Sequence, residues 1–95
     1  MFVALDEIDY LEANGNYVVV HTGGTSHLVR DTLQAMEQRL DPSRFARIHR
    51  RLIVATGRIV AIEPLFAGEY LVTLRSGEKL TSGRTYRTYV QELMK

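Results

Sequence analysis

The sequence of 95 residues contains no cysteine and only two prolines. The lack of cysteine excludes disulfides, thiolate nucleophiles and thiolate metal sites, and it favours a reducing cytoplasm. Apolar stretches such as Leu52 to Ala55 are far shorter than the roughly 18–20 residues of a membrane-spanning helix, and Met1 is followed by no signal-peptide pattern. We therefore expect a cytoplasmic domain without a membrane segment.

The length and composition predict one folded domain. Folded units have roughly 50–200 residues, so this chain is too short for two hydrophobic cores. With 45% hydrophobic and 24% charged residues, it is ordinary for a globular domain and unlike a disordered segment. Because Phe2 to Leu5 already has the pattern of a strand, we interpret residues 1–95 as a domain of a longer protein.

Charge is divided unevenly along the chain, although the formal net charge is only +1. Residues 1–43 contain seven acidic residues and two arginines, whereas residues 44–95 contain ten basic and four acidic residues. Such a basic half is either a solvated surface or a face that binds a polyanion. Ten of the twelve basic residues are arginine, which makes bidentate contacts to phosphate and guanine, and this favours the polyanion.

Short β-branched or alternating runs predict nine strands, separated by turns that contain glycine or asparagine. The spacing is that of hairpins and indicates an antiparallel meander. The predicted strands are Phe2 to Leu5, Ile8 to Glu12, Tyr17 to His21, Ser26 to Val29, Arg47 to His49, Leu52 to Ala55, Ile59 to Leu65, Tyr70 to Leu74 and Lys79 to Thr81.

Two short helices are expected to interrupt the strands. Asp31 is the predicted cap of the first, with Gln34 completing a capping box, and Pro42 ends it. Ser82 is the predicted cap of the second, whose apolar stripe we assign to core packing by Tyr86, Tyr89, Val90, Leu93 and Met94. The predicted fold class is mainly β, with small antiparallel sheets and two short helices.

No compact catalytic set is present in the sequence. The histidines lack the spacing and the neighbouring carboxylates or thiolates of a zinc site, and phosphate-loop, serine-elbow and dinucleotide motifs are missing. An acidic cluster without EF-hand spacing is interpreted as a solvated edge formed by Asp6, Glu7, Asp9 and Glu12. We therefore expect no enzymatic activity, no cofactor and no metal site.

Two loop segments carry polar residues of the kind that bind ligands on a β scaffold. The turn from Glu12 to Tyr17 presents the amides of Asn14 and Asn16, which can pair with an adenine edge, although asparagine is also a common turn residue. Ser82 to Tyr86 begins a helix whose free backbone amides favour phosphate, with Arg84 beside them.

Between these segments, Phe45 to Val54 is rich in arginine. Strand alternation would place Arg47, His49 and Arg51 on one side. A bend between the two strands predicted here would leave Arg50 free to point outward.

These segments, in this order and spacing, resemble the LytTR family of bacterial DNA-binding domains. The family pattern I-x-Y-x-E-A-x-G-N-Y matches Ile8 to Tyr17, and F-x-R-I-H-R matches Phe45 to Arg50. A strand with the pattern G-x-Y-x-V-x-L matches Gly68 to Leu74, and the start of a final helix matches Ser82 to Tyr86. One departure is Arg51, where many members have a small polar residue. The resemblance covers essentially the whole chain.

The resemblance implies a domain of three small antiparallel sheets in an elongated arrangement, usually the output domain of a two-component response regulator. Such domains bind promoter DNA, commonly as two copies on direct repeats, and place loops in successive major grooves. Carried over to this sequence, the DNA-facing positions are Asn16, Arg50 and Arg84. Further contacts are expected from Arg47, His49, Asn14, Arg87 and Lys79.

The sequence therefore predicts sequence-specific binding of double-stranded promoter DNA by a bacterial transcriptional regulator, as a dimer on DNA. Phosphate contacts from Arg47, Arg87 and Lys79 would supply affinity. The alternative is a protein- or ligand-interaction β domain whose arginine face meets an acidic partner. An enzyme acting on phosphorylated substrates would need a nucleophile or metal site that the sequence does not offer.

Overall fold

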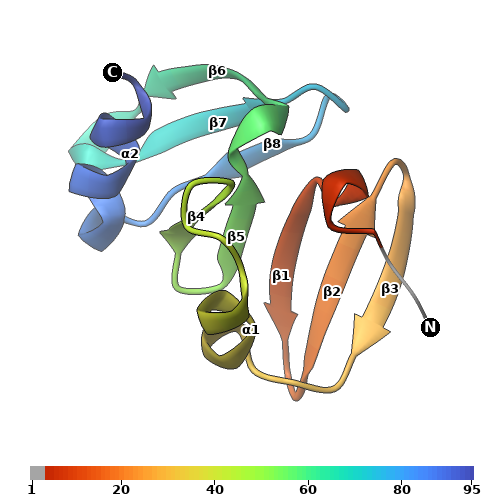
Figure 1. The fold of residues 1–95 in the computed structure, drawn as a ribbon. Helices are drawn as coiled ribbons and strands as arrows, with labels where there is room; N and C mark the ends of the chain where they lie inside the picture. Colours follow the sequence, from red (N-terminus) through yellow and green to blue (C-terminus); the bar gives the residue numbers. More distant parts are fainter. Residues whose placement is uncertain (1–3) are drawn as a thin grey trace.

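Runs of β-branched residues form two antiparallel sheets in the computed structural model, which describes residues 4–95 (Figure 1). The strand order is β3-β2-β1-β5-β4 in the first sheet and β6-β7-β8 in the second. The molecule is elongated, with extents of 38 × 23 × 21 Å. The predicted fold class of small antiparallel sheets with two short helices is confirmed.

Bounds of the elements agree with the predicted strands to within two residues, apart from the N-terminal one. The five-stranded sheet comprises β1 (Tyr10–Asn14), β2 (Tyr17–Thr22), β3 (Thr25–Val29), β4 (Phe45–His49) and β5 (Leu52–Ala55). The three-stranded sheet comprises β6 (Ile59–Pro64), β7 (Tyr70–Leu74) and β8 (Lys79–Thr81). The helices are α1 (Leu33–Arg39) and α2 (Arg87–Leu93), and short 3-10 turns are η1 (Leu5–Glu7), η2 (Thr56–Arg58), η3 (Phe66–Gly68) and η4 (Arg84–Tyr86).

The prediction of a strand over Phe2 to Leu5 is wrong for Ala4 and Leu5, the two of these residues that the structure describes. Leu5 begins the turn η1, in which the Glu7 N–H donates to the Ala4 carbonyl at 3.0 Å. This local hydrogen bond closes the backbone into a turn instead of a sheet ladder. Phe2 and Val3 lie outside the described residues.

The number of sheets differs from the three that the family resemblance implies. Strand β1 pairs with β2 on one edge and with β5 on the other, so that Leu11 lies opposite both Val20 and Ile53. The pairing of β1 with β5 joins the meander of β1, β2 and β3 to the hairpin of β4 and β5, which makes one five-stranded sheet. The chain therefore has two sheets within residues 4–95.

Two hydrophobic clusters lie on opposite faces of the five-stranded sheet. Because side chains alternate along a strand, Leu11 and Ile53 face one cluster while Tyr10 and Val54 face the other. The first cluster, covered by α1, contains Ile8, Leu11, Val18, Val20, Leu33, Phe45, Ile53 and Ala55. The second, shared with the three-stranded sheet and α2, contains Tyr10, Ile48, Val54, Val72, Leu74, Leu80 and Val90.

Helix α1 begins one residue later than Asp31 predicts. Thr32 has extended backbone angles, and its hydroxyl accepts from the Ala35 N–H at 3.1 Å, so Thr32 is the cap. Asp31 accepts instead from the Thr32 N–H at 2.8 Å. Gln34 is therefore too close to the cap for the predicted capping box, and the helix ends three residues before Pro42.

The prediction that Ser82 caps the C-terminal helix is also wrong. Ser82 is buried, and its hydroxyl accepts from the Tyr70 N–H at 3.0 Å, which ties the end of β8 to the start of β7. Val90 packs in the core as expected, but Tyr89 and Met94 are 67% and 51% exposed. In the described part of the chain, neither helix has the length or apolar character to cross a membrane.

Asp9 does not belong to a solvated acidic edge. Its side chain is buried, accepts from the Gly23 N–H at 3.0 Å and lies 3.6 Å from Nε of Arg58. The partners come from the β2–β3 turn and η2, which only the fold brings to the start of β1. The interpretation as a solvated edge is therefore wrong for Asp9, although Asp6 and Glu7 are exposed.

Candidate nucleic-acid interface

The turn between β4 and β5 brings the arginine-rich segment to the surface. Pairing of the two strands shifts register between Arg47 and His49, so the predicted alternation is interrupted there, and Ile48 is fully buried. Arg50 and Arg51 form the exposed tip. The bend expected to leave Arg50 pointing outward is present.

Arg51 links this tip to the turn between β1 and β2. Its Nε and Nη2 donate to the Ala13 carbonyl at 3.1 and 2.8 Å, and the Ala13 N–H donates to the Arg51 carbonyl at 2.9 Å. The two segments are 38 residues apart in sequence. Asn14 and Asn16 are consequently held beside the tip, and both side chains are exposed.

Residues 82–84 contact the end of β4, next to the β4–β5 turn. The Gly83 N–H donates to the Ile48 carbonyl at 2.8 Å, and a Cβ at Gly83 would lie only 3.3 Å from Cδ2 of His49. Glycine therefore permits the close approach that puts Arg84 near the turn. The amides of Ser82 and Gly83 already donate to protein carbonyls, so they are not the free amides predicted for a phosphate.

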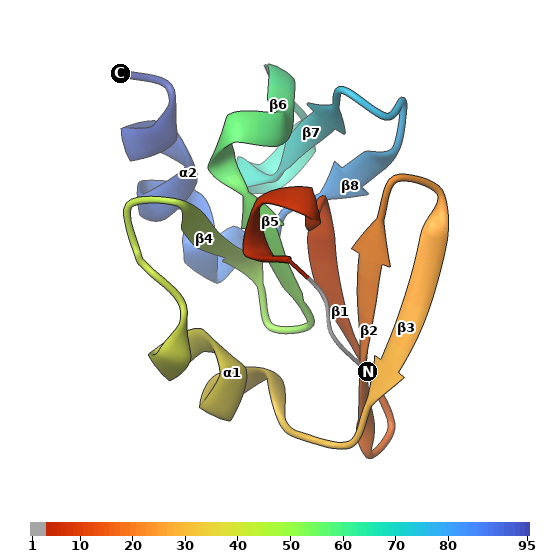
Figure 2. The same ribbon diagram turned by 45° about the vertical axis from the view of Figure 1, so that its right-hand side comes forward.

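We call these three segments together, residues 13–16, 48–51 and 82–84, the loop edge. It contains all three positions predicted to face DNA, and Asn16, Arg50 and Arg84 are all exposed. In Figures 1 and 2 the β1–β2 and β4–β5 turns lie on the same, lower side of the five-stranded sheet. The ion pairs within residues 4–95 use other basic residues, namely His21, Arg39, Arg47, Arg58 and Lys95.

An open groove of about 550 Å³ runs between the β1–β2 turn, the start of α1 and the β4–β5 turn. Asn16 and Arg50 both line it, which shows that side chains 34 residues apart in sequence share one surface. Arg30 and Asp31 line the same groove. The sequence motifs do not single out Arg30, because its relation to the arginine-rich segment depends on the return of the chain through α1.

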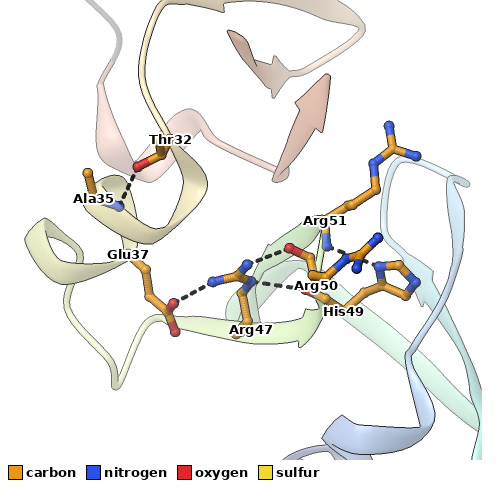
Figure 3. A network of polar contacts seen from close by, with 7 residues as sticks. All are labelled: Thr32, Ala35, Glu37, Arg47, His49, Arg50 and Arg51. Atoms are coloured by element: carbon orange, nitrogen blue, oxygen red, sulfur yellow. Dashed lines mark hydrogen bonds and ion pairs between the residues drawn. The ribbon is translucent and has the colours of Figure 1, made fainter. Parts of the chain in front are cut away.

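Arg47 is engaged with protein atoms rather than directed to solvent (Figure 3). Its Nε donates to the His49 carbonyl at 2.9 Å, its Nη2 donates to the Arg50 carbonyl, and its Nη1 donates to Oε1 of Glu37 at 2.7 Å. The side chain is 15% exposed. Nothing in the spacing of Glu37 and Arg47 signals this contact, because it crosses from α1 to β4.

His49 also has an internal role. Its Nδ1 accepts from the Arg51 N–H at 3.0 Å, which places the hydrogen of the neutral ring on Nε2. The ring packs against Gly83. His49 thus joins the β4–β5 turn to residues 82–84, and a contact of this residue with DNA stays a prediction.

The remaining predicted contacts lie away from the three segments. Arg87 extends over η3, because a Cβ at Gly68 would lie 3.3 Å from Cδ of Arg87. Lys79 begins β8 opposite Thr73, at the end of the strand that is farther from residues 82–84. Both side chains are exposed, and their roles stay predictions. No cluster with the ligands for a metal ion occurs among residues 4–95.

Known proteins resemble this chain in sequence over essentially its whole length. The model of the LytTr DNA-binding domain family matches residues 1–95. The sensory transduction protein LytT of Bacillus subtilis is 33% identical over 94 residues, which cover 99% of this chain and 39% of LytT. The CO-responsive transcriptional regulator RcoM of Rhodospirillum rubrum is 35% identical over 94 residues, 98% of this chain and 40% of RcoM.

A solved LytTr DNA-binding domain from Bacillus cereus has the same fold. It superimposes with a TM-score of 0.90 at 28% sequence identity, over 97% of this chain and 84% of that chain. The chain spans about two fifths of the length of the curated relatives it matches. The similarity therefore concerns only part of those relatives.

Proposed function

Because the chain belongs to the LytTR family of DNA-binding domains, we propose that its loop edge binds double-stranded promoter DNA sequence-specifically, as the DNA-binding part of a longer bacterial transcriptional regulator. LytT and RcoM, a sensory transduction protein and a transcriptional regulator, support the assignment to regulation. The family is one of DNA-binding domains and not of catalysts.

One observation carries the proposal: three segments distant in sequence are hydrogen-bonded into one edge that leaves Asn16, Arg50 and Arg84 exposed. The Arg51 side chain holds one flanking segment, and the Ile48 carbonyl holds the other. Arginine can bind guanine bidentately and asparagine can bind adenine, so the exposed groups match the donors and acceptors of a major groove.

In this proposal, Asn16 and Arg50 read bases and Arg84 binds phosphate. Separate loops at one edge suit successive major grooves better than a single recognition helix, since neither α1 nor α2 contributes these residues. We further propose that two copies occupy direct repeats on DNA.

A binding titration at several salt concentrations tests the proposal. A duplex selected by the protein from a random pool is compared with a scrambled duplex by fluorescence anisotropy. Binding through several phosphates predicts that log K falls steeply with log salt, with a slope of about −0.9 per phosphate. Indifference to both duplexes at low salt would instead favour the interaction module that meets an acidic protein or ligand.

A further inference from the structure

Arg47 holds both peptide groups that flank Arg50. The carbonyl of His49 belongs to the peptide before Arg50, and the carbonyl of Arg50 belongs to the peptide after it. One guanidinium donates to both carbonyls (Figure 3). Because the two peptide planes determine the backbone angles of Arg50, they also determine the direction in which its side chain leaves the turn.

Glu37 binds Nη1, the remaining nitrogen of the same guanidinium. Its Oε1 accepts from Nη1 of Arg47 at 2.7 Å, and Glu37 lies on α1, whose start is fixed by the Thr32 cap. Arginine has a planar fork of donors, so a partner at one corner orients the other donors. The ion pair therefore couples the position of α1 to the geometry of the β4–β5 turn.

We propose that Glu37 and Arg47 are positioning residues, which hold the β4–β5 turn in the conformation that directs Arg50 at DNA. The inference rests on the proposed function, and it assigns Arg47 a role other than the phosphate contact expected from the sequence. Three of its five N–H donors are already used by protein acceptors.

Replacement of Glu37 distinguishes a positioning role from a purely electrostatic one, because the two roles predict opposite changes in DNA affinity. Glu37 is 43% exposed on its side chain and lies at a face proposed to bind a polyanion. By charge alone, its replacement by an uncharged residue should strengthen binding to every duplex. Positioning predicts the opposite for the selected duplex, because the guanidinium loses its anchor and the turn loosens.

The first test compares Glu37→Met, which has no oxygen to accept from Arg47, with Asp31→Asn in binding to the selected and scrambled duplexes. Asp31 lines the same groove and is the charge control: Asp31→Asn removes the same charge and keeps an oxygen for the Thr32 N–H, and the ion pair it alters is with Arg39 and not with Arg47. We expect Glu37→Met to weaken binding to the selected duplex by roughly 3- to 10-fold, the effect of one hydrogen bond, and Asp31→Asn to leave it unchanged or tighter. Equal behaviour of the two variants would overturn the proposal.

The second test uses Arg47→Lys, which keeps the charge but cannot hold three acceptors in one plane. A positioning role predicts roughly tenfold loss of preference for the selected duplex, with the salt slope unchanged. A phosphate contact predicts that lysine retains the preference, which would contradict the proposal. Thermal unfolding of each variant shows whether it folds, and Glu37→Met decides the matter if Arg47→Lys does not fold.

Failure of the inference and failure of the proposed function give different results. If the unaltered protein binds neither duplex, both are wrong. If it binds the selected duplex and Glu37→Met binds as Asp31→Asn does, DNA binding stands and only the positioning role falls.

Discussion

At one end of the five-stranded sheet, Arg58 is held by protein: its Nη2 donates to the Asp6 carbonyl at 2.6 Å and its Nε lies 3.6 Å from the buried Asp9. At the loop edge, the opposite end of the same strands, Arg50 is exposed and only its backbone carbonyl takes part in a side-chain hydrogen bond within residues 4–95. We call the first region the closed end; it comprises residues 6–9, 22–25 and 56–58.

The comparison shows that arginine content alone does not mark a binding surface. The closed end uses Arg58 to satisfy a carbonyl and a buried carboxylate, whose desolvation would otherwise be costly. At the loop edge, Arg51 and the neighbouring Arg47 are held in a similar way, whereas the Arg50 side chain is exposed. Substitutions at the closed end should therefore change stability, whereas those at exposed positions of the loop edge should change DNA binding.

The largest effect is expected from Asp9→Ala at the closed end. The change removes the acceptor of the Gly23 N–H and the carboxylate that pairs with Arg58, which keeps only the Asp6 carbonyl, and we expect the free energy of unfolding to fall by about 3 kcal/mol. Urea unfolding measures the change in the free energy of unfolding. The control is Asp6→Ala, which removes an exposed acidic side chain from the same segment of the chain. A normal free energy of unfolding for Asp9→Ala would show that the closed end does not need its carboxylate.

Arg50→Ala should have the largest effect at the loop edge. We expect specific DNA binding to weaken by about 1–3 kcal/mol, the range for a bidentate or charged base contact, with the melting temperature nearly unchanged. Arg75→Ala removes the same charge from an exposed side chain next to Gly57 and should have little effect on specificity. Loss of stability with intact DNA affinity would make Arg50 a structural residue.

The buried phenol of Tyr10, at the start of β1 next to the closed end, makes stability depend on alkaline pH. Burial, with smaller contributions from nearby acids, raises the pKa of Tyr10 to about 12 from 10. In the unfolded chain the phenol ionises first, so stability is complete below pH 10 and falls as the pH rises toward 12, by on the order of 2 kcal/mol. Unfolding curves across this window should lose the decline in Tyr10→Phe but keep it in Tyr17→Phe, which changes a residue that is 42% exposed.

Arg84→Ala should weaken binding to all duplexes by about 1 kcal/mol, because a phosphate contact is independent of sequence. The magnitude of the salt slope should fall by about one unit in an anisotropy titration. Lys95→Ala, in which the lost charge is paired with Glu92, should leave the slope unchanged. An effect restricted to the selected duplex would make Arg84 a base reader instead.

The smallest effect on affinity is expected from Asn16→Ala. A neutral amide releases no counterion, so the salt slope should stay the same while the preference for the selected over the scrambled duplex falls by about 1 kcal/mol. Asn14→Ala changes the other amide of the same turn and is the matched comparison. Preserved preference in Asn16→Ala would leave Asn16 as a turn residue only.

Local sequence patterns were sufficient to predict the positions of most of the strands. The bounds of β5, β7 and β8 are the predicted ones, because a short β-branched run and its flanking turn are properties of adjacent residues. Helix starts were less predictable, since Asp31 and Thr32 are both good caps and the backbone angles decide between them. Pairing of β1 with β5 was not predictable from either strand alone.

By itself, the sequence determined the strand content, the excess of arginine in its second half and the motif positions Asn16, Arg50 and Arg84. Only the tertiary structure decided which arginines are free, because the acceptors of Arg47 and Arg51 include Glu37 and Ala13, which lie on other elements. A guanidinium is held wherever the fold places acceptors at its donors. For Arg51, the position of the acceptor depends on strand pairing between segments 38 residues apart in sequence. The pattern of neighbouring residues does not determine such pairing.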